Sequence, residues 1–354
     1  MISMRHIVVL AALVTSAAAP DAAWAQGPPP SIPPPLTPIE RPFAQRRGQR
    51  PPIDERIRRA EERRGAEVTE PFSRTLTLGR NGTFELTNPS GDIVITGGRG
   101  DQLRIDAVKR ARQQDEAEAR RLLTAIEIDV AERTGLVQVR TLFPRARNWS
   151  GGVDYTVTLP DSASVVVRGV SGNVRVTNIG GDLRADTVSG DLAVTNVRRL
   201  RSVRAVSGDV EISQAEGQDT TAGTVSGSVT VRGLKAQGMT VESVSGDIRM
   251  SDAEIDRVRL RTVSGDVDFA GRLARGGRYE MESHSGDIRV QSDGGFDLEA
   301  STFSGGLQSN VQLRGETNDG GRGRPNRVLR GTRGDAGAIL TLRTFSGDVT
   351  VSER

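Results

Sequence analysis

The sequence predicts a mainly β protein, a parallel β-helix or β-solenoid of roughly 19-residue coils with a small mixed α/β cap at the N-terminal end. Two observations carry this prediction. The triplet Ser-Gly-Asp recurs through the second half of the chain, and apolar residues alternate with polar ones on both sides of it. Repeats of this length are typical of stacked solenoid units. An aromatic content of 3% leaves the core to Val, Leu, Ile and small residues.

The spacing of the Ser-Gly pairs defines the repeat. From residue 171 to residue 304 the steps are 18, 18, 19, 19, 19, 21 and 19 residues, and a step of 42 residues leads to the last pair. An earlier pair at Ser90 stands apart. Because the last step is two coils long, we expect a loop insertion at residues 315–337. The repeated pairs begin at Ser171, Ser189, Ser207, Ser226, Ser245, Ser264, Ser285, Ser304 and Ser346.

Side chains alternate within each repeat. The residue four positions before the Ser is always apolar, as at Val203, and the residue two before it is always small, as at Thr224. After the motif an apolar position returns, as at Val210. A period of two predicts strands with one buried face, so two short strands joined by Ser-Gly-Asp make one coil. The column of small residues predicts a narrow interior filled by side chains.

The first 25 residues have the features of a secretory signal peptide. Arg5 provides a positive charge, residues 7–14 an apolar core, and Ala23-Trp24-Ala25 a small-x-small cleavage site. No later stretch approaches the roughly 20 apolar residues of a membrane-spanning helix. We therefore expect an exported mature chain without a transmembrane segment, in the periplasm or at the cell surface. It has no cysteines and hence no disulfides.

Residues 26–67 are predicted to be a disordered linker rich in Pro and Arg. Ten of the 16 prolines lie between Pro28 and Pro52. Such a spacer extends about 3.1 Å per residue and is therefore long enough to hold the folded part away from a surface. The alternative is a disordered linker without that role. Residues 68–163 are expected to form the N-terminal cap, with seven strands and a helix at 113–126. The solenoid itself is assigned to residues 164–354.

Three segments carry a family resemblance. "FELTNPSGDIVITGG" (84–98), "VDYTVTLPDSASVVVRGVSGNVRV" (153–176) and the Val-Ser-Gly-Asp coils are similar to the bacterial putative-adhesin β-strand-repeat family, a domain of unknown function. The resemblance covers about residues 68–354. It implies an exported β-solenoid and no catalytic residues.

The Ser-Gly-Asp motif has two interpretations. The Gly suits a corner that needs a positive φ or close backbone stacking, and the Asp can close an Asx-type turn. The alternative is a calcium ladder, which uses Asp and backbone oxygens. The third position changes to Asn173, Ser228 and Gly306, which favours turn chemistry. We expect no cofactor, with weak calcium binding as the alternative.

Composition argues against several functions. His284 is the only histidine after the leader and there is no cysteine, which closes zinc sites and His- or Cys-based nucleophilic catalysis. His284 stands in a slot otherwise filled by Val or Phe, so we interpret it as a substitution in a structural column. Residues 40–67 carry nine Arg against six acidic residues, which accounts for the net charge of +3. The remainder shows no basic stripe, so nucleic-acid binding is not expected.

The sequence thus predicts a non-catalytic binding, adhesion or scaffold element at the bacterial cell envelope, with an envelope polymer or protein as partner. It indicates no catalytic, cofactor-binding or metal-binding residues. Because the ends of a solenoid expose strand edges, self-association is a further expectation. Trp149 is either a contact residue or a lid of the cap, and the Arg-rich segment 322–333 either contacts anionic polymers or is a solvated loop. The alternatives are a polysaccharide-acting β-helix enzyme and a calcium-stabilised rod.

Overall fold

The structure is a computed structural model that describes residues 66–144, 150–319, 327–335 and 337–354. The predicted signal peptide, residues 26–65 of the predicted linker, Trp149 and residues 322–326 of the Arg-rich segment lie outside the described residues. The described part is mainly β, with mostly parallel pairing and one helix. No helix in it is long and apolar enough to cross a membrane.

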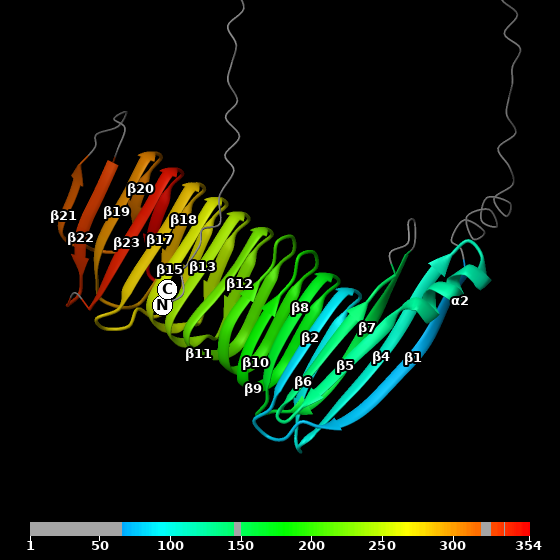
Figure 1. Ribbon diagram of the computed structural model, residues 1–354. Helices are drawn as coiled ribbons and strands as arrows, with labels where there is room; N and C mark the ends of the chain where they lie inside the picture. The colour runs from blue at the N-terminus through cyan, green and yellow to red at the C-terminus, as the bar shows by residue number, and fades with distance from the viewer. Residues whose placement is uncertain (1–65, 145–149, 320–326, 336) are drawn as a thin grey trace, which may run out of the picture. The chain divides into compact units, whose positions relative to one another are not determined.

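Strands and helix follow in a simple order (Figure 1). The N-terminal part holds β1 (Ala66–Thr77), β2 (Thr83–Ser90), β3 (Ile93–Gly98), β4 (Gln102–Gln113), α2 (Glu116–Ala125), β5 (Glu127–Arg133), β6 (Leu136–Leu142) and β7 (Ser150–Pro160). The repeats hold β8 (Ser164–Ser171), β9 (Val174–Asp186), β10 (Leu192–Arg204), β11 (Val210–Ser226), β12 (Val229–Arg232), β13 (Lys235–Ser245), β14 (Ile248–Ser251), β15 (Glu254–Ser264) and β16 (Val267–Ala270). The C-terminal part holds β17 (Arg278–Ser285), β18 (Ile288–Gln291), β19 (Phe296–Ser304), β20 (Leu307–Ser309), β21 (Arg314–Asp319), β22 (Arg327–Arg333), β23 (Ala338–Ser346) and β24 (Val349–Ser352).

Equivalent residues of successive repeats lie side by side. Strand β13 runs parallel between β11 and β15, with Ser245 beside Ser226 and Ser264. After the corner, β14 runs parallel between β12 and β16, with Ile248 beside Val229 and Val267. Each position of the repeat therefore becomes a column that runs along the stack.

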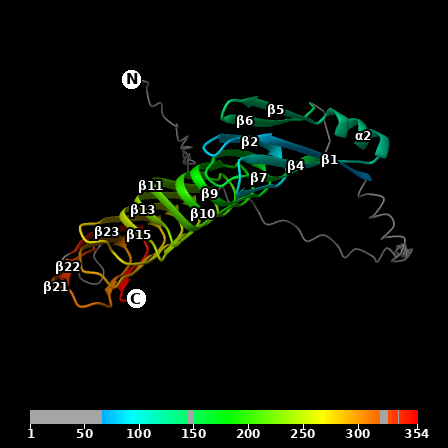
Figure 2. The same cartoon turned by 90° about the horizontal axis from the view of Figure 1, so that it is seen from below.

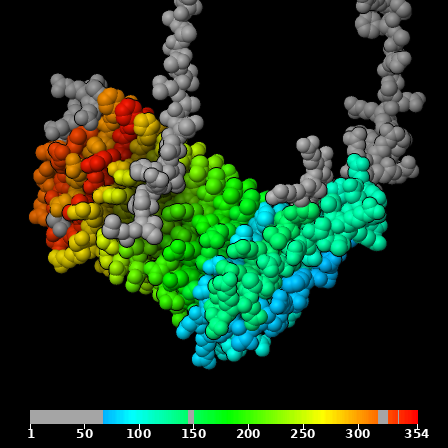
Figure 3. Space-filling view, in the orientation of Figure 1, coloured from blue at the N-terminus to red at the C-terminus, as the bar shows by residue number. Residues whose placement is uncertain are grey.

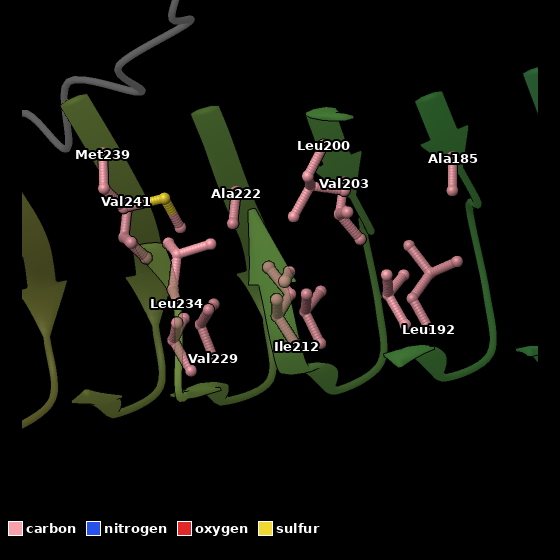
Figure 4. Close-up of a cluster of buried hydrophobic side chains, with 14 of the residues drawn as sticks. Ala185, Leu192, Leu200, Val203, Ile212, Ala222, Val229, Leu234, Met239 and Val241 are labelled. Atoms are coloured by element: carbon pink, nitrogen blue, oxygen red, sulfur yellow. The ribbon is translucent and has the colours of Figure 1, made fainter. Parts of the chain in front are cut away.

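The interior is filled by the apolar columns that the alternation predicts. Val203, Ala222 and Val241 point inward from the strands before the Ser-Gly pair, and Ile212 and Val229 point inward from the strands after it (Figure 4). All five are less than 5% exposed. Burial of a large apolar side chain contributes about 1.5–3 kcal/mol, so these short strands are held mainly by their shared core.

The first coil lies further towards the N-terminus than the sequence analysis placed it. Ser90 at the end of β2 lies beside Ser171, and Ile93 of β3 lies beside Val174. Residues 83–98, which were assigned to the cap, thus form a coil of the stack. In the sequence the pair at Ser90 looks isolated from the repeats, because 81 residues separate it from Ser171. The strands in between continue the two sheets of the stack outward.

Those intervening strands end the stack in two ways. Strand β6 lies parallel to β2, and β5 closes an antiparallel hairpin on it. Strand β7 lies parallel to β3, and β4 and β1 follow in antiparallel order. Helix α2 packs on β1 and β4 through buried Ala119 and Leu123, beside the β5–β6 hairpin (Figure 2). Its first turn is capped by Asp115, whose side chain accepts from the Ala117 N–H at 3.2 Å.

The last coil is inserted into the stack. Strand β23 pairs in parallel with β17 on one side and β19 on the other, so residues 338–352 lie between two coils that precede them in the chain. In Figures 1 and 3 the red coil lies between yellow and orange ones. The 19-residue step from Ser285 to Ser304 therefore spans two strand spacings, about 9.6 Å, where other steps span about 4.8 Å.

The segment expected to be a loop insertion contains two strands. Strand β22 pairs antiparallel with β19, and β21 pairs antiparallel with β22. The hairpin therefore lies along the outer edge of β19. Arg330 of β22 contacts Glu299 of β19 at 3.1 Å, and Thr332 donates to Asp297 at 2.7 Å. The Gly-rich composition of residues 315–337 favours a loop. The segment forms strands all the same, because β22 pairs with the edge of β19.

Candidate functional site

The Ser-Gly-Asp corner is built by backbone packing. Gly208 has φ +141°, and a Cβ there would lie 2.2 Å from the carbonyl oxygen of Gly190 in the neighbouring coil. No other residue fits this position. The corner therefore repeats Gly because of its φ and the close approach of coils, as the sequence analysis expected.

The Asp residues form a ladder between coils, which we call the Asp ladder. Asp191 Oδ1 accepts the N–H of Asp209 at 2.9 Å, and Asp209 Oδ1 accepts the N–H of Ser228 at 2.8 Å. Asn173 performs the same task with its amide oxygen, at 3.0 Å from the N–H of Asp191. The expected Asx-type turn is corrected here, because these carboxylates bind the next coil. The described members are Asp154, Asp92, Asn173, Asp191, Asp209, Asp247, Asp266, Asp287 and Asp348.

Arginines occupy the second carboxylate oxygens at one end of the ladder. Arg289 contacts Oδ2 of Asp266 at 2.9 Å and of Asp287 at 2.7 Å, and Arg249 contacts Oδ2 of Asp247 at 2.6 Å. Burial acts to raise the pKa of Asp266, but the N–H of Asp287 and the Arg289 guanidinium outweigh it, and the pKa is lowered. Across the described ranges no group of three or more His, Cys, Asp or Glu side chains could hold a metal ion.

The most unusual surface is an apolar ridge formed by the residues directly before the nine Ser-Gly pairs from Ser171 onwards. Its eight apolar side chains are each 44–51% exposed. The interpretation of this slot as a structural column is wrong, because the column faces solvent. In stacking order the ridge consists of Val170, Val188, Val206, Val225, Val244, Val263, His284, Phe345 and Phe303.

The alternation could have revealed the ridge. Positions four and two before the Ser point inward, so the position directly before it must point outward. Apolar residues at an outward position in every repeat were the signal. Single exposed apolar residues are common, whereas a continuous line of them is not.

Three stacked rings form the C-terminal end of the ridge. Phe345 lies between His284, at a centroid distance of 5.0 Å and 9° between planes, and Phe303, at 4.8 Å and 3°. Both faces of the Phe345 ring are therefore covered by neighbours. A molecule that approaches the ridge from the side meets the ring edge of Phe345, which carries the positive part of the quadrupole.

A groove of about 770 Å³ runs beside this end of the ridge. Its floor is the column of small residues. Two of its hydroxyls bind backbone, since Thr262 donates to the Gly246 carbonyl at 3.2 Å and Thr344 to the Gly286 carbonyl at 3.0 Å. The far wall carries charges that alternate in sign along the stack, with Arg261 at 3.0 Å from Glu282. The wall residues are Glu242, Arg261, Glu282 and Arg343.

Neighbouring arginines lower the pKa of two carboxylates. The pKa of Asp106 is lowered mainly by its hydrogen bond from Arg104, and that of Asp266 is lowered as described above. The general acid of a glycosidase has the opposite shift, a raised pKa. Burial raises the pKa of Tyr155 to about 12, and its hydroxyl lies 2.7 Å from that of Thr141 inside the core.

Two arginines in the described part of the Arg-rich segment already have acidic partners. Arg330 contacts Glu299 at 3.1 Å, and Arg333 contacts Glu353 at 2.8 Å. These two guanidinium groups therefore join the hairpin to the solenoid. The predicted contact role of segment 322–333 gains no support from them.

Fold and surface together define a β-solenoid protein with an exposed apolar ridge. The chain belongs to the Toastrack DUF4097 family, whose model matches residues 83–352. This confirms the resemblance drawn from the Ser-Gly-Asp coils. The match begins at the first residue of β2 and ends at the last residue of β24, so it spans the whole stack, including the coil at Ser90.

Solved structures similar to this chain come from several bacteria. A putative adhesin from Bacteroides fragilis NCTC 9343 is 12% identical, with 80% of this chain and 97% of that chain covered and a TM-score of 0.39. A putative adhesin from Parabacteroides distasonis ATCC 8503 is 12% identical, with the same coverage and a TM-score of 0.37. A putative cell adhesion protein from Clostridium sporogenes ATCC 15579 is 9% identical, with 80% and 100% covered and a TM-score of 0.24. Among curated proteins none matches this chain.

Proposed function

We propose that this protein is an exported, non-catalytic binding, adhesion or scaffold element of the bacterial cell envelope, and that the ridge and its groove are its contact surface. One observation carries the proposal: eight apolar side chains, each about half exposed, stand in one line along the stack. Folded monomers rarely expose a continuous apolar patch larger than a few hundred Å² unless it has a partner.

The repeat explains how such a surface is built. With one coil of roughly 19 residues as the unit, each coil adds one ridge residue at about 4.8 Å from the last. The core below keeps these positions fixed, because the strands that carry or directly precede them are buried on their inner face. A binding surface on rigid strands loses little conformational entropy when its partner docks.

Export is inferred from the N-terminal sequence. The positive residue, apolar core and cleavage site of residues 1–25 support secretion, and the absence of cysteine agrees with a chain that folds without disulfides. Periplasm and cell surface are both compatible with this proposal. No cofactor takes part in it.

The test is co-sedimentation of purified residues 26–354 with envelope fractions of the bacterium that makes the protein. The variant replaces three ridge residues by isosteric Thr, Val206→Thr/Val225→Thr/Val244→Thr, because Thr keeps the β-branched shape that strands favour. Val108→Thr is the matched control, since Val108 is 41% exposed on β4 and lies outside the ridge.

We expect wild type and Val108→Thr to bind saturably and the ridge variant to lose at least tenfold in affinity. Melting temperatures of the three proteins establish that each is folded. Equal binding by the folded ridge variant would overturn the proposal that the ridge is the contact surface.

A further inference from the structure

We propose that the ridge binds the ridge of a second copy of this chain, so that two solenoids pair side by side. This inference rests on the proposed function, because it names the partner of the same surface. The reasons are the spacing of the ridge residues, the geometry of its rings, the charges beside it and its area.

Spacing comes first. Neighbouring ridge residues are one strand spacing apart, about 4.8 Å. An extended peptide laid along the ridge presents side chains on one face every 6.4–6.8 Å or so, and a polyproline helix repeats about every 9 Å. The extended peptide does not match the ridge residue for residue, and the polyproline repeat is close to two ridge spacings, so it contacts only every second ridge residue. A second copy has the same period and stays in step over the whole length.

The aromatic end argues against a flat ligand. Because Phe345 is stacked between His284 and Phe303, neither face of its ring is open to a sugar ring or a base from the side. At Phe345 and the valines, the ridge therefore presents a ring edge and methyl groups to the side. Such a surface suits apolar side chains that arrive at regular intervals.

The charges beside the ridge argue against a uniformly charged polymer. The groove wall alternates from Glu242 to Arg261, Glu282 and Arg343, and Arg261 and Glu282 already pair with each other at 3.0 Å. An anionic polymer would meet as many acidic as basic groups there and gain no net attraction. A partner with the same alternation can place opposite charges against this wall.

The area is sufficient for a concentration-dependent pair. Nine ridge positions span about 38 Å at one strand spacing each. The four columns from the charged wall to the Ser lie on one side of the corner and are about 13 Å wide at roughly 3.3 Å per residue. Together they cover roughly 500 Å² on each copy, or about 1,000 Å² in the pair, which is the lower end for a specific interface.

The experiment is sedimentation velocity of residues 26–354 over a hundredfold range of concentration. We expect a monomer–dimer equilibrium for wild type and Val108→Thr, and at least a tenfold weaker dimer for Val206→Thr/Val225→Thr/Val244→Thr. A monomer at every concentration would overturn the inference. A dimer that the folded ridge variant leaves unchanged would overturn it too, since pairing would then use another surface such as a strand edge.

A second arm separates this inference from the proposed function. Binding is measured to envelopes from wild-type cells and from cells lacking the gene. Pairing between copies predicts ridge-dependent binding to the first and none to the second. Equal ridge-dependent binding to both would overturn the second-copy partner while supporting the ridge as a contact surface. A ridge-dependent dimer with ridge-independent envelope binding would support the pairing and overturn the proposed envelope contact.

Discussion

At the scale of single residues, the recurring triplet divides its tasks between two directions. The Gly allows the positive φ of its own corner and the close approach of the neighbouring coil's backbone. That role could be predicted from the sequence. The Asp acts on the next coil, 18 to 21 residues or more along the chain. Its partner could not be predicted, because a local turn and an inter-coil bond use the same residue type.

The Asp ladder predicts that an acceptor matters more than a charge. Asp209→Ala should lower the free energy of unfolding by about 1 kcal/mol, since the Ser228 N–H loses its acceptor at a partly solvated site. Asp209→Asn should keep most of that free energy, because its amide oxygen can accept the same N–H, as Asn173 does in its own coil. Urea denaturation measures both, with Asp256→Ala as control because Asp256 is an exposed residue of β15 outside the ladder. An Asn variant as unstable as the Ala variant would contradict this account.

Because Tyr155 is buried, we predict that the free energy of unfolding falls at alkaline pH. Its pKa is raised from 10.0 to about 12 by burial, so the unfolded chain ionises first as the pH rises. The contribution of this pKa difference to the free energy of unfolding is complete below pH 10 and is lost as the pH rises from 10 to about 12. Denaturation curves at pH 9, 10, 11 and 12 should show this decline, and Tyr155→Phe should flatten it within that window. An unchanged slope in the Phe variant would assign the effect to other groups.

At the scale of elements, strands were predictable and their order in space was only partly so. The period-two alternation located the coil strands, and seven strand candidates before residue 164 correspond to β1–β7. The inserted position of β23 and β24 could not be predicted. Every coil presents the same columns, so nothing in the pattern distinguishes a coil that stacks last from one that enters between two others. The ridge was missed for another reason, since an outward apolar column was interpreted as structural.

The inserted coil predicts a specific set of cross-links. Ser346 lies beside both Ser285 and Ser304, at about 4.8 Å between Cα atoms, which is within the 4.4–6.8 Å that a disulfide requires. Ser285 and Ser304 are two spacings apart, about 9.6 Å. In this cysteine-free chain, Cys pairs at 285/346 and 304/346 should oxidise to disulfides, and a pair at 285/304 should not. Gel mobility without reductant distinguishes them, and efficient bonding of 285/304 would mean that the coils stack in chain order.

At the scale of the whole molecule, the repeat serves stability and surface at once. The same stacking that buries the inner columns lines up the ridge, the charged wall and the Asp ladder on the outside. Composition and repeat length were enough to predict this architecture. They could not name a partner, because the contact surface depends on which columns become neighbours around the corner.

Calcium removal tests whether the ladder is held by protein bonds alone. The Oδ1 atoms of the ladder accept backbone N–H groups, and Arg249 and Arg289 bind the Oδ2 atoms of Asp247, Asp266 and Asp287. We therefore predict that the melting temperature is the same within 1–2 °C with millimolar calcium or with a chelator, where about 1 kcal/mol would shift it by 2–4 °C. A large fall on chelation would support the calcium-stabilised rod instead.

The most direct test of the central claim is thiol cross-linking of single-cysteine variants in solution. Val225→Cys places one thiol in the middle of the ridge, and Val108→Cys places one on an exposed strand position outside it. With a short bismaleimide, the account predicts a covalent dimer for Val225→Cys at micromolar protein and little for Val108→Cys. Equal yields from the two positions, or no dimer from Val225→Cys in a folded protein, would contradict the claim that two ridges meet.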